Sequence, residues 1–279
     1  MNNIKIVVDS SSDLVALKHV SFACAPLKIV TDEKEYIDNV ELDVRAFAEE
    51  MYHYKGTSRT SCPNVTDWLE AFGDAEEIFC LTITSNLSGA HNSACLAKQI
   101  YEEDHPGRRV EVIDTLTAGP EIALMAKKIR DKIVEGKDFD TVAAEIKDYK
   151  TELLFVLESM KNLANNGRVG KLAATAAGVL GIRAVGRASD EGTLEMLSKC
   201  RGSAKALEAI VNYMKEFGFK GGLVRIAHCL NGCAAKSLAS KIKAEFPEAK
   251  IVVTECRGLC SFYAERGGML IGYEVCSQL

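Results

Sequence analysis

Hydroxyl-bearing side chains gather in two short segments of the sequence. Residues 57–63 are expected to form a loop between two helical patterns, and they hold four hydroxyls within five positions. Residues 85–89 lead from an apolar run into another helical pattern, so that Ser88 and the Gly89 amide fall at a helix N-terminus. Free N–H groups and the helix dipole favour a carboxylate or phosphate at such a position. The two segments predict an anion site, although helix capping alone would explain the same residues.

Two further polar segments are candidates for contact with a ligand or a partner. Residues 9–13, Asp-Ser-Ser-Ser-Asp, follow the first apolar strand, and open α/β sheets place their ligands at the C-terminal ends of strands. Capping of a short helix explains them equally well. In residues 165–171, glycines permit a tight turn, while Arg168 and Lys171 are suited to phosphate groups or an acidic partner. A plain turn before an alanine-rich helix is the alternative there.

The overall composition narrows the class of protein. With 47% hydrophobic and 26% charged residues, the sequence is that of an ordinary globular protein. A formal net charge of -5 gives no electrostatic footprint for nucleic acid. No window approaches the ~18 apolar residues of a membrane-spanning helix, and the first residues do not form a signal peptide. We expect a cytoplasmic protein with no nucleic-acid partner and no transmembrane segment; transient contact with a membrane surface stays open.

Ten cysteines raise the question of a metal or redox site. Because no export signal is present, we expect reduced thiols rather than disulfides. The pairs Cys229/Cys233 and Cys256/Cys260 share a C-x-x-x-C spacing, which suits a metal or iron–sulfur site less well than C-x-x-C. Packed or surface thiols are the favoured interpretation. Neither G-x-G-x-x-G nor G-x-x-x-x-G-K-[ST] occurs, so we predict no metal and no cofactor.

The first half of the chain alternates strand-like and helix-like patterns. Compact apolar runs at residues 4–9, 78–84 and 110–114 are each followed by a helical segment. Such alternation predicts a parallel sheet with crossover helices. The expected helices cover residues 44–54, 65–72, 88–101, 120–135 and 139–150.

The second half of the chain has a different order of strand-like and helix-like patterns. A strand at residues 152–157 leads into a Gly/Ala-rich helical stretch, and strands at 182–188 and 194–197 are joined as a hairpin. Two helix–strand units and a last strand follow, at residues 204–217, 223–228, 234–246, 251–254 and 269–275. We therefore predict an α/β protein with two α/β domains. Residues 1–155 would hold a parallel sheet with crossover helices, and residues 156–279 a mixed or antiparallel sheet with helices.

Six short motifs occur in order along nearly the whole chain. They are D-S-S-S-D-L at residues 9–14, T-S-x-x-S at 57–61, S-x-L-S-G at 85–89, V-I-D-T at 112–115, G-R-V-G-K at 167–171 and R-G-x-x-K-A-L at 201–207. Each motif is modest alone, but the ordered set with sensible spacing is hard to obtain by chance. On these motifs the sequence resembles the DegV family.

The resemblance implies a bacterial fatty-acid-binding protein with the acyl chain buried between or beneath two α/β domains, and not an enzyme in its own right. Members of this kind present a long-chain fatty acid to a separate ATP-dependent kinase, which phosphorylates the carboxylate. By motif, the residues expected to meet the carboxylate are Thr57, Ser58, Arg59, Ser88 and Gly89. The candidates for contact with the kinase are Arg168, Lys171 and Arg201.

Two departures from the family pattern bear on this function. Family members carry Gln-Pro inside a T-S-Q-P-S loop, where this chain has Arg59-Thr60. The family's C-terminal H-T-G-P-G signature, whose histidine approaches the head group, is replaced by residues 261–268, which contain no histidine. We expect binding to survive these changes, whereas coupling to a kinase stays open. The alternative is a lipid binder without a kinase partner.

A serine hydrolase is an alternative from a different class. Ser88 would be its nucleophile and His91 its general base. The G-x-S-x-G elbow is absent, and His91 lies about one turn along the same helix, which is poor geometry for a base. The sequence therefore favours binding over catalysis.

Overall fold

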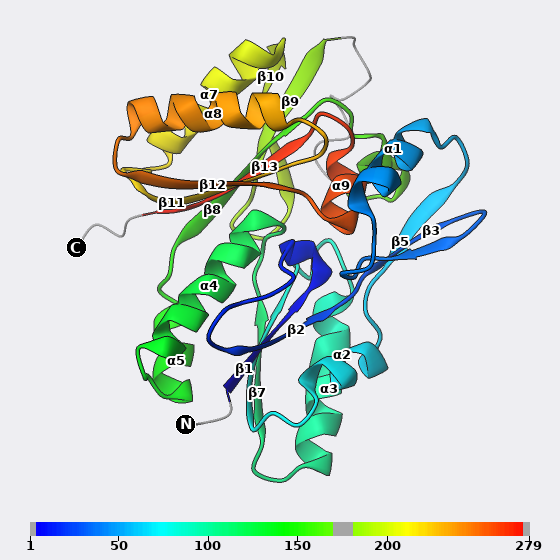
Figure 1. Cartoon of the computed structure of the whole chain (residues 1–279), viewed down its shortest axis with the longest axis vertical. Helices are drawn as coiled ribbons and strands as arrows, with labels where there is room; N and C mark the ends of the chain where they lie inside the picture. The colour runs from blue at the N-terminus through cyan, green and yellow to red at the C-terminus, as the bar shows by residue number, and fades with distance from the viewer. Residues whose placement is uncertain (1–3, 170–180, 276–279) are drawn as a thin grey trace.

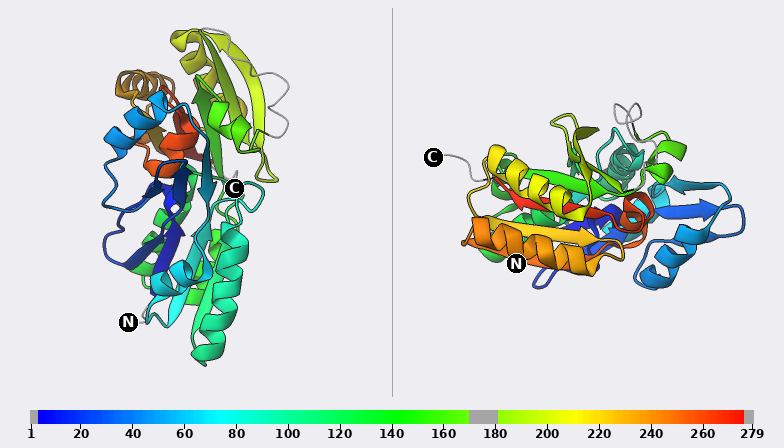
Figure 2. Two further views of the ribbon diagram at one scale, coloured as in Figure 1. Left: turned by 90° about the vertical axis from the view of Figure 1, so that its right-hand side faces the viewer. Right: turned by 90° about the horizontal axis from the view of Figure 1, so that it is seen from above.

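The computed structural model describes residues 4–169 and 181–275, and its elements form two stacked halves (Figure 1). A four-stranded sheet with its helices occupies one end of the long axis, and a six-stranded sheet with its helices occupies the other. A small three-stranded sheet projects from the side (Figures 1 and 2). The predicted α/β fold, with a parallel N-terminal sheet and a mixed C-terminal sheet, is confirmed.

The N-terminal sheet has the order β2-β1-β6-β7, and every neighbouring pair is parallel. Its strands are β1 (Ile4–Asp9), β2 (Ser21–Ala25), β6 (Glu77–Thr82) and β7 (Arg109–Asp114). Ile6, Val7 and Val8 of β1 are completely buried. Consecutive buried residues of this kind are typical of a parallel strand that is covered on both faces.

The predicted helices of the first half are present, with ends that shift by a few residues. They are α1 (Val44–His53), α2 (Val65–Phe72), α3 (Ala90–Asp104), α4 (Pro120–Val134) and α5 (Phe139–Ile146). Local signals set their starts. The Asn64 and Asp67 side chains form a capping box on α2, and Pro120 is the first residue of α4. Because α3 begins at Ala90, Ser88 and Gly89 stand just ahead of its first turn.

The C-terminal sheet has the order β10-β9-β8-β13-β11-β12 and pairs only β11 with β12 in parallel. Its strands are β8 (Thr151–Leu157), β9 (Ile182–Ala188), β10 (Leu194–Arg201), β11 (Gly222–His228), β12 (Ala249–Glu255) and β13 (Met269–Glu274). The helices of this half are α6 (Lys161–Asn165), α7 (Ser203–Glu216), α8 (Gly232–Glu245) and α9 (Gly258–Ala264). Since β8 belongs to this sheet, the two sheets divide before Thr151, whereas the predicted domain boundary at residue 155 falls inside the strand.

Strand β2, the small sheet β4-β3-β5 and the short helix α9 are missing from the sequence-based prediction. The sheet consists of β3 (Lys28–Thr31), β4 (Glu35–Ile37) and β5 (Ser58–Ser61). The expectation of a loop at residues 57–63 is wrong for β5. Its polar residues show no apolar alternation, and antiparallel pairing with β3 gives them their extended form. The main part of the expected Gly/Ala-rich helix, at 170–180, lies outside the described residues.

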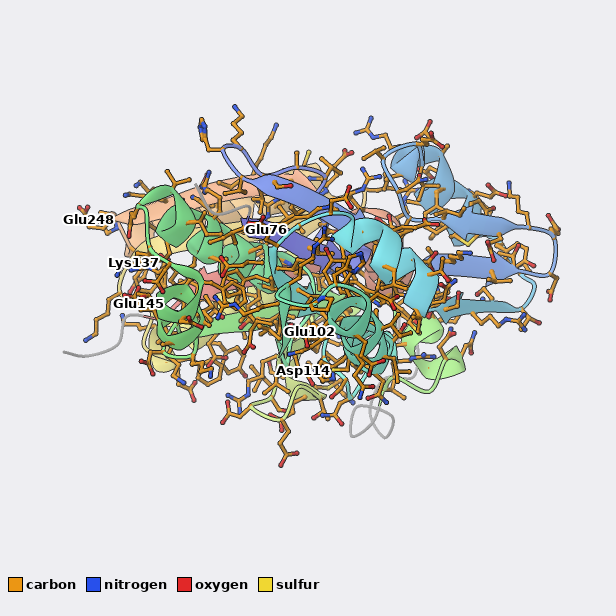
Figure 3. The ribbon with its side chains drawn as sticks, turned by 90° about the horizontal axis from the view of Figure 1, so that it is seen from below. Glu76, Glu102, Asp114, Lys137, Glu145 and Glu248 are labelled. Carbon is orange, nitrogen blue, oxygen red and sulfur yellow. The ribbon has the colours of Figure 1, made fainter. Side chains whose placement is uncertain are left out.

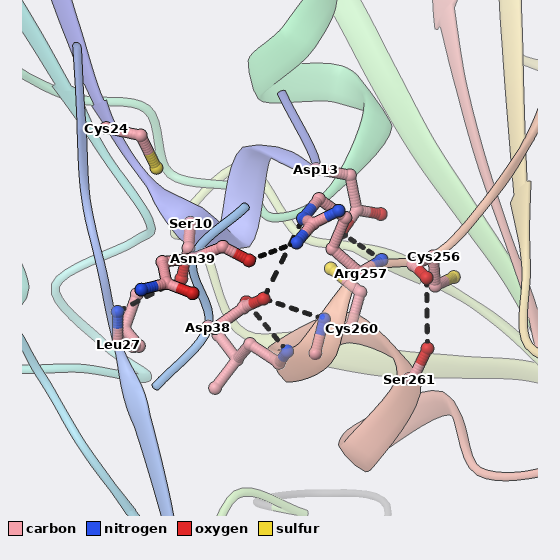
Figure 4. Close-up of polar contacts among 12 residues, drawn as sticks. Ser10, Asp13, Cys24, Leu27, Asp38, Asn39, Cys256, Arg257, Cys260 and Ser261 are labelled. Carbon is pink, nitrogen blue, oxygen red and sulfur yellow. Dashed lines mark hydrogen bonds and ion pairs between the residues drawn. The ribbon is translucent and has the colours of Figure 1, made fainter. Parts of the chain in front are cut away.

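Carboxylates from the N-terminal half hold the start of α9 (Figure 4). Asp38, which is 1% exposed, accepts the backbone N–H groups of Gly258 and Leu259 at 2.8 and 2.9 Å. Asp13, which follows β1, accepts the N–H of Arg257 at 2.8 Å. The first N–H groups of a helix have no partner inside it, so these side chains supply the acceptors that α9 needs. α9 is thereby attached to the N-terminal half.

Burial raises the pKa of both carboxyl groups, and it raises the pKa of Asp13 to about 7. The N–H groups of α9 oppose the rise in the pKa of Asp38, because they stabilise its charged form. The Arg257 guanidinium, 4.0 Å from the Asp38 carboxylate, acts in the same direction. Arg257 also donates to the Asn39 carbonyl, so its position is fixed by the same loop.

Replacing Asp38 with Asn removes one of the two acceptors at the start of α9 while keeping the size of the side chain. We expect the free energy of unfolding to fall by about 2–3 kcal/mol, since a buried N–H loses a charge-assisted hydrogen bond. Chemical denaturation followed by circular dichroism measures the loss. The control, Asp148→Asn at an exposed position, should change stability by less than about 0.5 kcal/mol. Equal stability of the two variants would contradict this role of Asp38.

Candidate functional site

A cavity of about 280 Å³ lies between the two halves of the molecule. Strands β8, β10 and β13 of the C-terminal sheet contribute to its wall, together with α6 and α9. The N-terminal half contributes the end of β5 and loops beyond the ends of its strands, including the loop that precedes α3. Most of its lining side chains are apolar. These are Leu27, Ile83, Leu87, Ala118, Leu153, Phe155, Leu157, Leu163, Leu194, Leu259, Ala264 and Leu270.

The alternation of β8 shows how the sequence builds this wall. Successive side chains of a strand point to opposite faces of its sheet. Leu153, Phe155 and Leu157 face the cavity, whereas Leu154 and Val156 point into the core beneath α7 and α8. One face of the continuous apolar run of β8 therefore lines the cavity, and the other face packs in the core of the C-terminal half.

Hydroxyl groups from three segments meet in one part of the lining. Thr60 and Ser61 lie at the end of β5, Ser88 precedes α3, and Tyr263 lies on α9. Thr60 Oγ1 and Tyr263 Oη are hydrogen-bonded at 2.7 Å. Burial raises the pKa of Tyr263, so its hydroxyl keeps its proton at neutral pH and remains a donor.

Gly89 lets the end of β5 approach the start of α3 closely. A Cβ added at Gly89 would stand 3.3 Å from Cys62 Sγ, so a larger residue would fit only if the Cys62 side chain moved slightly. Ser88 Oγ accepts the N–H of Ala90 at 3.2 Å, which places this hydroxyl at the N-terminus of α3. The partial positive charge of that helix end therefore acts on the same part of the cavity.

The loop that carries Ser88 is held from both halves. Asp114, at the end of β7 (Figure 3), accepts the N–H of Ser85 at 3.2 Å. The Asn86 side-chain amide donates to the Glu191 carbonyl, in the β9–β10 hairpin, at 2.6 Å. The position of the Ser88 hydroxyl thus depends on both sheets.

Arg168 lines the same cavity as these hydroxyl groups and carries a positive charge. Its Nε donates to the Leu87 carbonyl at 3.3 Å and its Nη1 to the Asn166 carbonyl at 2.6 Å. Within residues 4–169 and 181–275, it forms no ion pair with a carboxylate. A guanidinium that is held by carbonyls and lacks a counter-ion is suited to bind an anion. We use the name polar cluster for Thr60, Ser61, Ser88, Arg168 and Tyr263.

The structure brings together only part of the set predicted to meet a carboxylate. Ser88 and Gly89 line the cavity. Thr57 and Arg59 are exposed, and Ser58 is half-buried in β5. None of these three is a lining residue.

The Thr-Ser pair that reaches the cavity is Thr60-Ser61, three positions further along the chain. A sequence signal for it exists, because Pro63 follows Thr60 at the spacing of the family's T-S-Q-P-S loop. Cys62 then stands at the glutamine position. Tyr263 carries no comparable signal, and only the folded chain shows that it contacts Thr60 within the segment that lacks the family's histidine.

The remaining predicted positions have different surroundings. Of the residues expected to contact a partner, Arg168 lines the cavity, Arg201 is exposed at the end of β10, and Lys171 lies outside the described residues. Asp9, in the first polar segment, accepts the N–H of Ile83 at 2.7 Å and so joins the ends of β1 and β6. Its carboxylate therefore supports the sheet edge beside the cavity.

Within the described residues, neither the hydrolase nor the metal alternative finds supporting geometry. His91 Nε2 lies 3.7 Å from Cys95 Sγ and forms no hydrogen bond with Ser88. Cys256 and Cys260 pack in a buried apolar cluster. Across the described residues, no group of three or more His, Cys, Asp or Glu side chains is placed to hold a metal ion. None of the helices in that part of the chain combines the length and apolar composition that spanning a bilayer requires.

The sequence matches proteins of one family. The model described as "Uncharacterised protein, DegV family" matches residues 3–274. A DegV domain-containing protein of Streptococcus pneumoniae is 43% identical over 277 residues, which cover 97% of this chain and 99% of the relative.

Two solved structures resemble the whole chain. A DegV family protein from Eubacterium eligens, loaded with heptadecanoic acid, is 41% identical, with a TM-score of 0.95 and coverage of 98% of this chain and 100% of that one. The fatty acid kinase (Fak) B3 protein of Streptococcus pneumoniae, loaded with linoleic acid, is 43% identical, with a TM-score of 0.95 and coverage of 99% and 100%. With the family model spanning nearly its full length, this chain belongs to the DegV family.

Proposed function

We propose that this protein binds one long-chain fatty acid in the cavity between its halves, with the acyl chain on the apolar wall and the carboxylate at the polar cluster. One observation carries the proposal. A buried apolar cavity holds, in one part of its lining, several hydroxyls and an arginine that has no ion pair among the described residues. The similar structures loaded with heptadecanoic and linoleic acid support it.

The apolar wall accounts for affinity toward an alkyl chain. Leu153, Phe155 and Leu157 are at most 3% exposed, so a chain packed against them is removed from water. Burial of each methylene contributes roughly 0.8 kcal/mol. Long acyl chains therefore gain much more from this cavity than short ones.

The polar cluster offsets the cost of burying a carboxylate. A carboxylate taken out of water must be neutralised or fully hydrogen-bonded. The Arg168 guanidinium provides the charge, and the start of α3 adds its partial positive charge. The residues proposed to bind the carboxylate are Thr60, Ser61, Ser88, Gly89, Arg168 and Tyr263.

The carboxylate end of the site is the more accessible one. Ser61 and Gly89 are exposed, whereas the leucines and Phe155 of β8 are buried. A bound fatty acid would thus hide its chain and keep its carboxylate near the surface, within reach of a second protein. This supports a binding subunit that presents the fatty acid to a separate kinase and does no chemistry itself. The likeness to the pneumococcal Fak B3 protein points the same way.

Affinity should rise with acyl chain length until the cavity is filled. For saturated fatty acids of about 10 to 18 carbons, we expect each added methylene to tighten binding up to about fourfold before a plateau. Isothermal titration of delipidated protein measures the series. Affinity that does not depend on chain length would contradict an apolar binding cavity.

Arg168→Met keeps an extended apolar stem but removes the guanidinium. We expect it to weaken fatty-acid binding by about tenfold or more, while the affinity for the alcohol of equal chain length changes little. The control is Arg201→Met, at the exposed end of β10, which should bind like the wild type. If Arg168→Met weakens acid and alcohol equally, then Arg168 shapes the cavity and does not bind the carboxylate.

Kinase coupling needs its own assay. The loaded protein is incubated with ATP, with and without the catalytic subunit of a bacterial fatty acid kinase, and acyl phosphate is trapped with hydroxylamine. We expect product only with both proteins, because neither of the common phosphate-binding loop motifs occurs in this sequence. Turnover without the kinase would refute a purely binding role. No product in its presence would refute the coupling and leave a lipid binder.

A further inference from the structure

A second cavity, of about 580 Å³, lies at the start of α8 and shares no lining residue with the apolar cavity. Its wall comes from four places: one face of α1, the C-terminal ends of β11 and β12, the first turns of α8, and the turn after α9. Figure 1 shows α1 beside α9 at this end of the C-terminal sheet. Ligands of α/β sheets commonly bind beyond the C-terminal ends of parallel strands.

Basic side chains outnumber acidic ones in this cavity. Arg45 pairs with Glu255 at 2.9 Å, and Arg266 pairs with Glu49 at 2.8 Å. Lys236 also lines the cavity and has no ion pair within the described residues. Both arginine pairs are solvent-exposed, and such pairs contribute little, so the guanidinium groups can turn toward a ligand at small cost.

The start of α8 presents backbone N–H groups to the same space. Its N-cap residue, Asn231, makes no side-chain capping hydrogen bond. The Asn231 amide donates instead to the Gly267 carbonyl at 2.7 Å. Gly232, the first helical residue, lines the cavity and has no side chain to cover its N–H. The positive end of the α8 dipole is therefore open toward the cavity.

His228 gives independent evidence that this space receives a ligand. It is 7% exposed and lines the cavity at the end of β11. Its Nδ1 accepts the N–H of Asn231 at 3.3 Å, which leaves the proton of the neutral ring on Nε2. In the described part of the chain, Nε2 has no hydrogen-bond partner, and it stands 3.4 Å from the position of a Cβ on Gly232. A buried donor is thus directed at the start of α8.

We propose that this cavity binds the phosphate group of a phosphate monoester. Such a group carries close to two negative charges and three acceptor oxygens, which can meet donors from several directions at once. Here the donors are the His228 Nε2–H, the first N–H groups of α8, and the cations Lys236, Arg45 and Arg266. The site stands apart from the proposed fatty-acid cavity and does not depend on it.

The test is isothermal titration of the lipid-loaded full chain with glycerol 3-phosphate and with inorganic phosphate at low ionic strength. We expect saturable binding of the monoester, at least as tight as that of inorganic phosphate. Lys236→Met should weaken it about tenfold. The matched control, Lys241→Met, removes the same charge from the same helix outside the cavity and should stay within about twofold of the wild type.

Three results would overturn the proposal. The first is that the monoester shows no saturable binding up to about 10 mM. The second is that the two lysine variants weaken monoester binding equally. The third is that the protein binds inorganic phosphate but not the monoester. A second variant, His228→Phe, separates a specific site from general attraction of anions. Phenylalanine lacks the Nε2–H donor and, like the neutral histidine ring, carries no charge. We therefore expect about tenfold weaker binding of the monoester. Unchanged affinity would also count against the proposal.

Discussion

The buried carboxylate of Asp38, which accepts two N–H groups at the start of α9, is the contact on which the apolar cavity depends. α9 forms one side of that cavity through Leu259, Tyr263 and neighbouring residues, yet it belongs by sequence to the C-terminal half. A helix of this length cannot order itself in water, so its position must come from tertiary contacts. Asp13, on the adjacent N–H, extends the same attachment. Loss of these contacts would remove the buried acceptors that hold the start of α9 to the N-terminal half.

The two halves of the molecule contribute different parts of the proposed binding site. The C-terminal half supplies most of the apolar wall, in part because β8 directs alternate residues into the cavity and into the core of its own sheet. The N-terminal half supplies hydroxyls at the end of β5 and ahead of α3, each fixed by backbone contacts rather than by packing. The hydrogen bond between Thr60 and Tyr263 joins the two contributions. A fatty acid, with one charged end and a long apolar chain, is the ligand that both parts would satisfy together.

Regular patterns made much of the fold predictable from the sequence. Consecutive apolar residues marked three of the four strands of the N-terminal sheet, β1, β6 and β7, whereas β2 was not predicted. The helix starts expected at residues 65 and 120 are confirmed. The small sheet was not predictable, because β5 is polar and takes its shape from a partner strand distant in sequence. For the site, Ser88 and Gly89 were expected from their place at a helix start, and both line the cavity. Thr57 and Ser58 were expected from the motif, but Thr60 and Ser61 line the cavity in their place. Arg168 and Tyr263 join the cluster only through contacts between segments far apart in sequence.

Native mass spectrometry of protein purified without added ligand would show whether the cavity holds a single fatty acid. We expect one bound species per chain, released on denaturation and identified as a long-chain fatty acid. Its chain length would then define the natural ligand. Protein that is empty as purified, and that still takes up no fatty acid when one is supplied, would be incompatible with fatty-acid binding in this cavity.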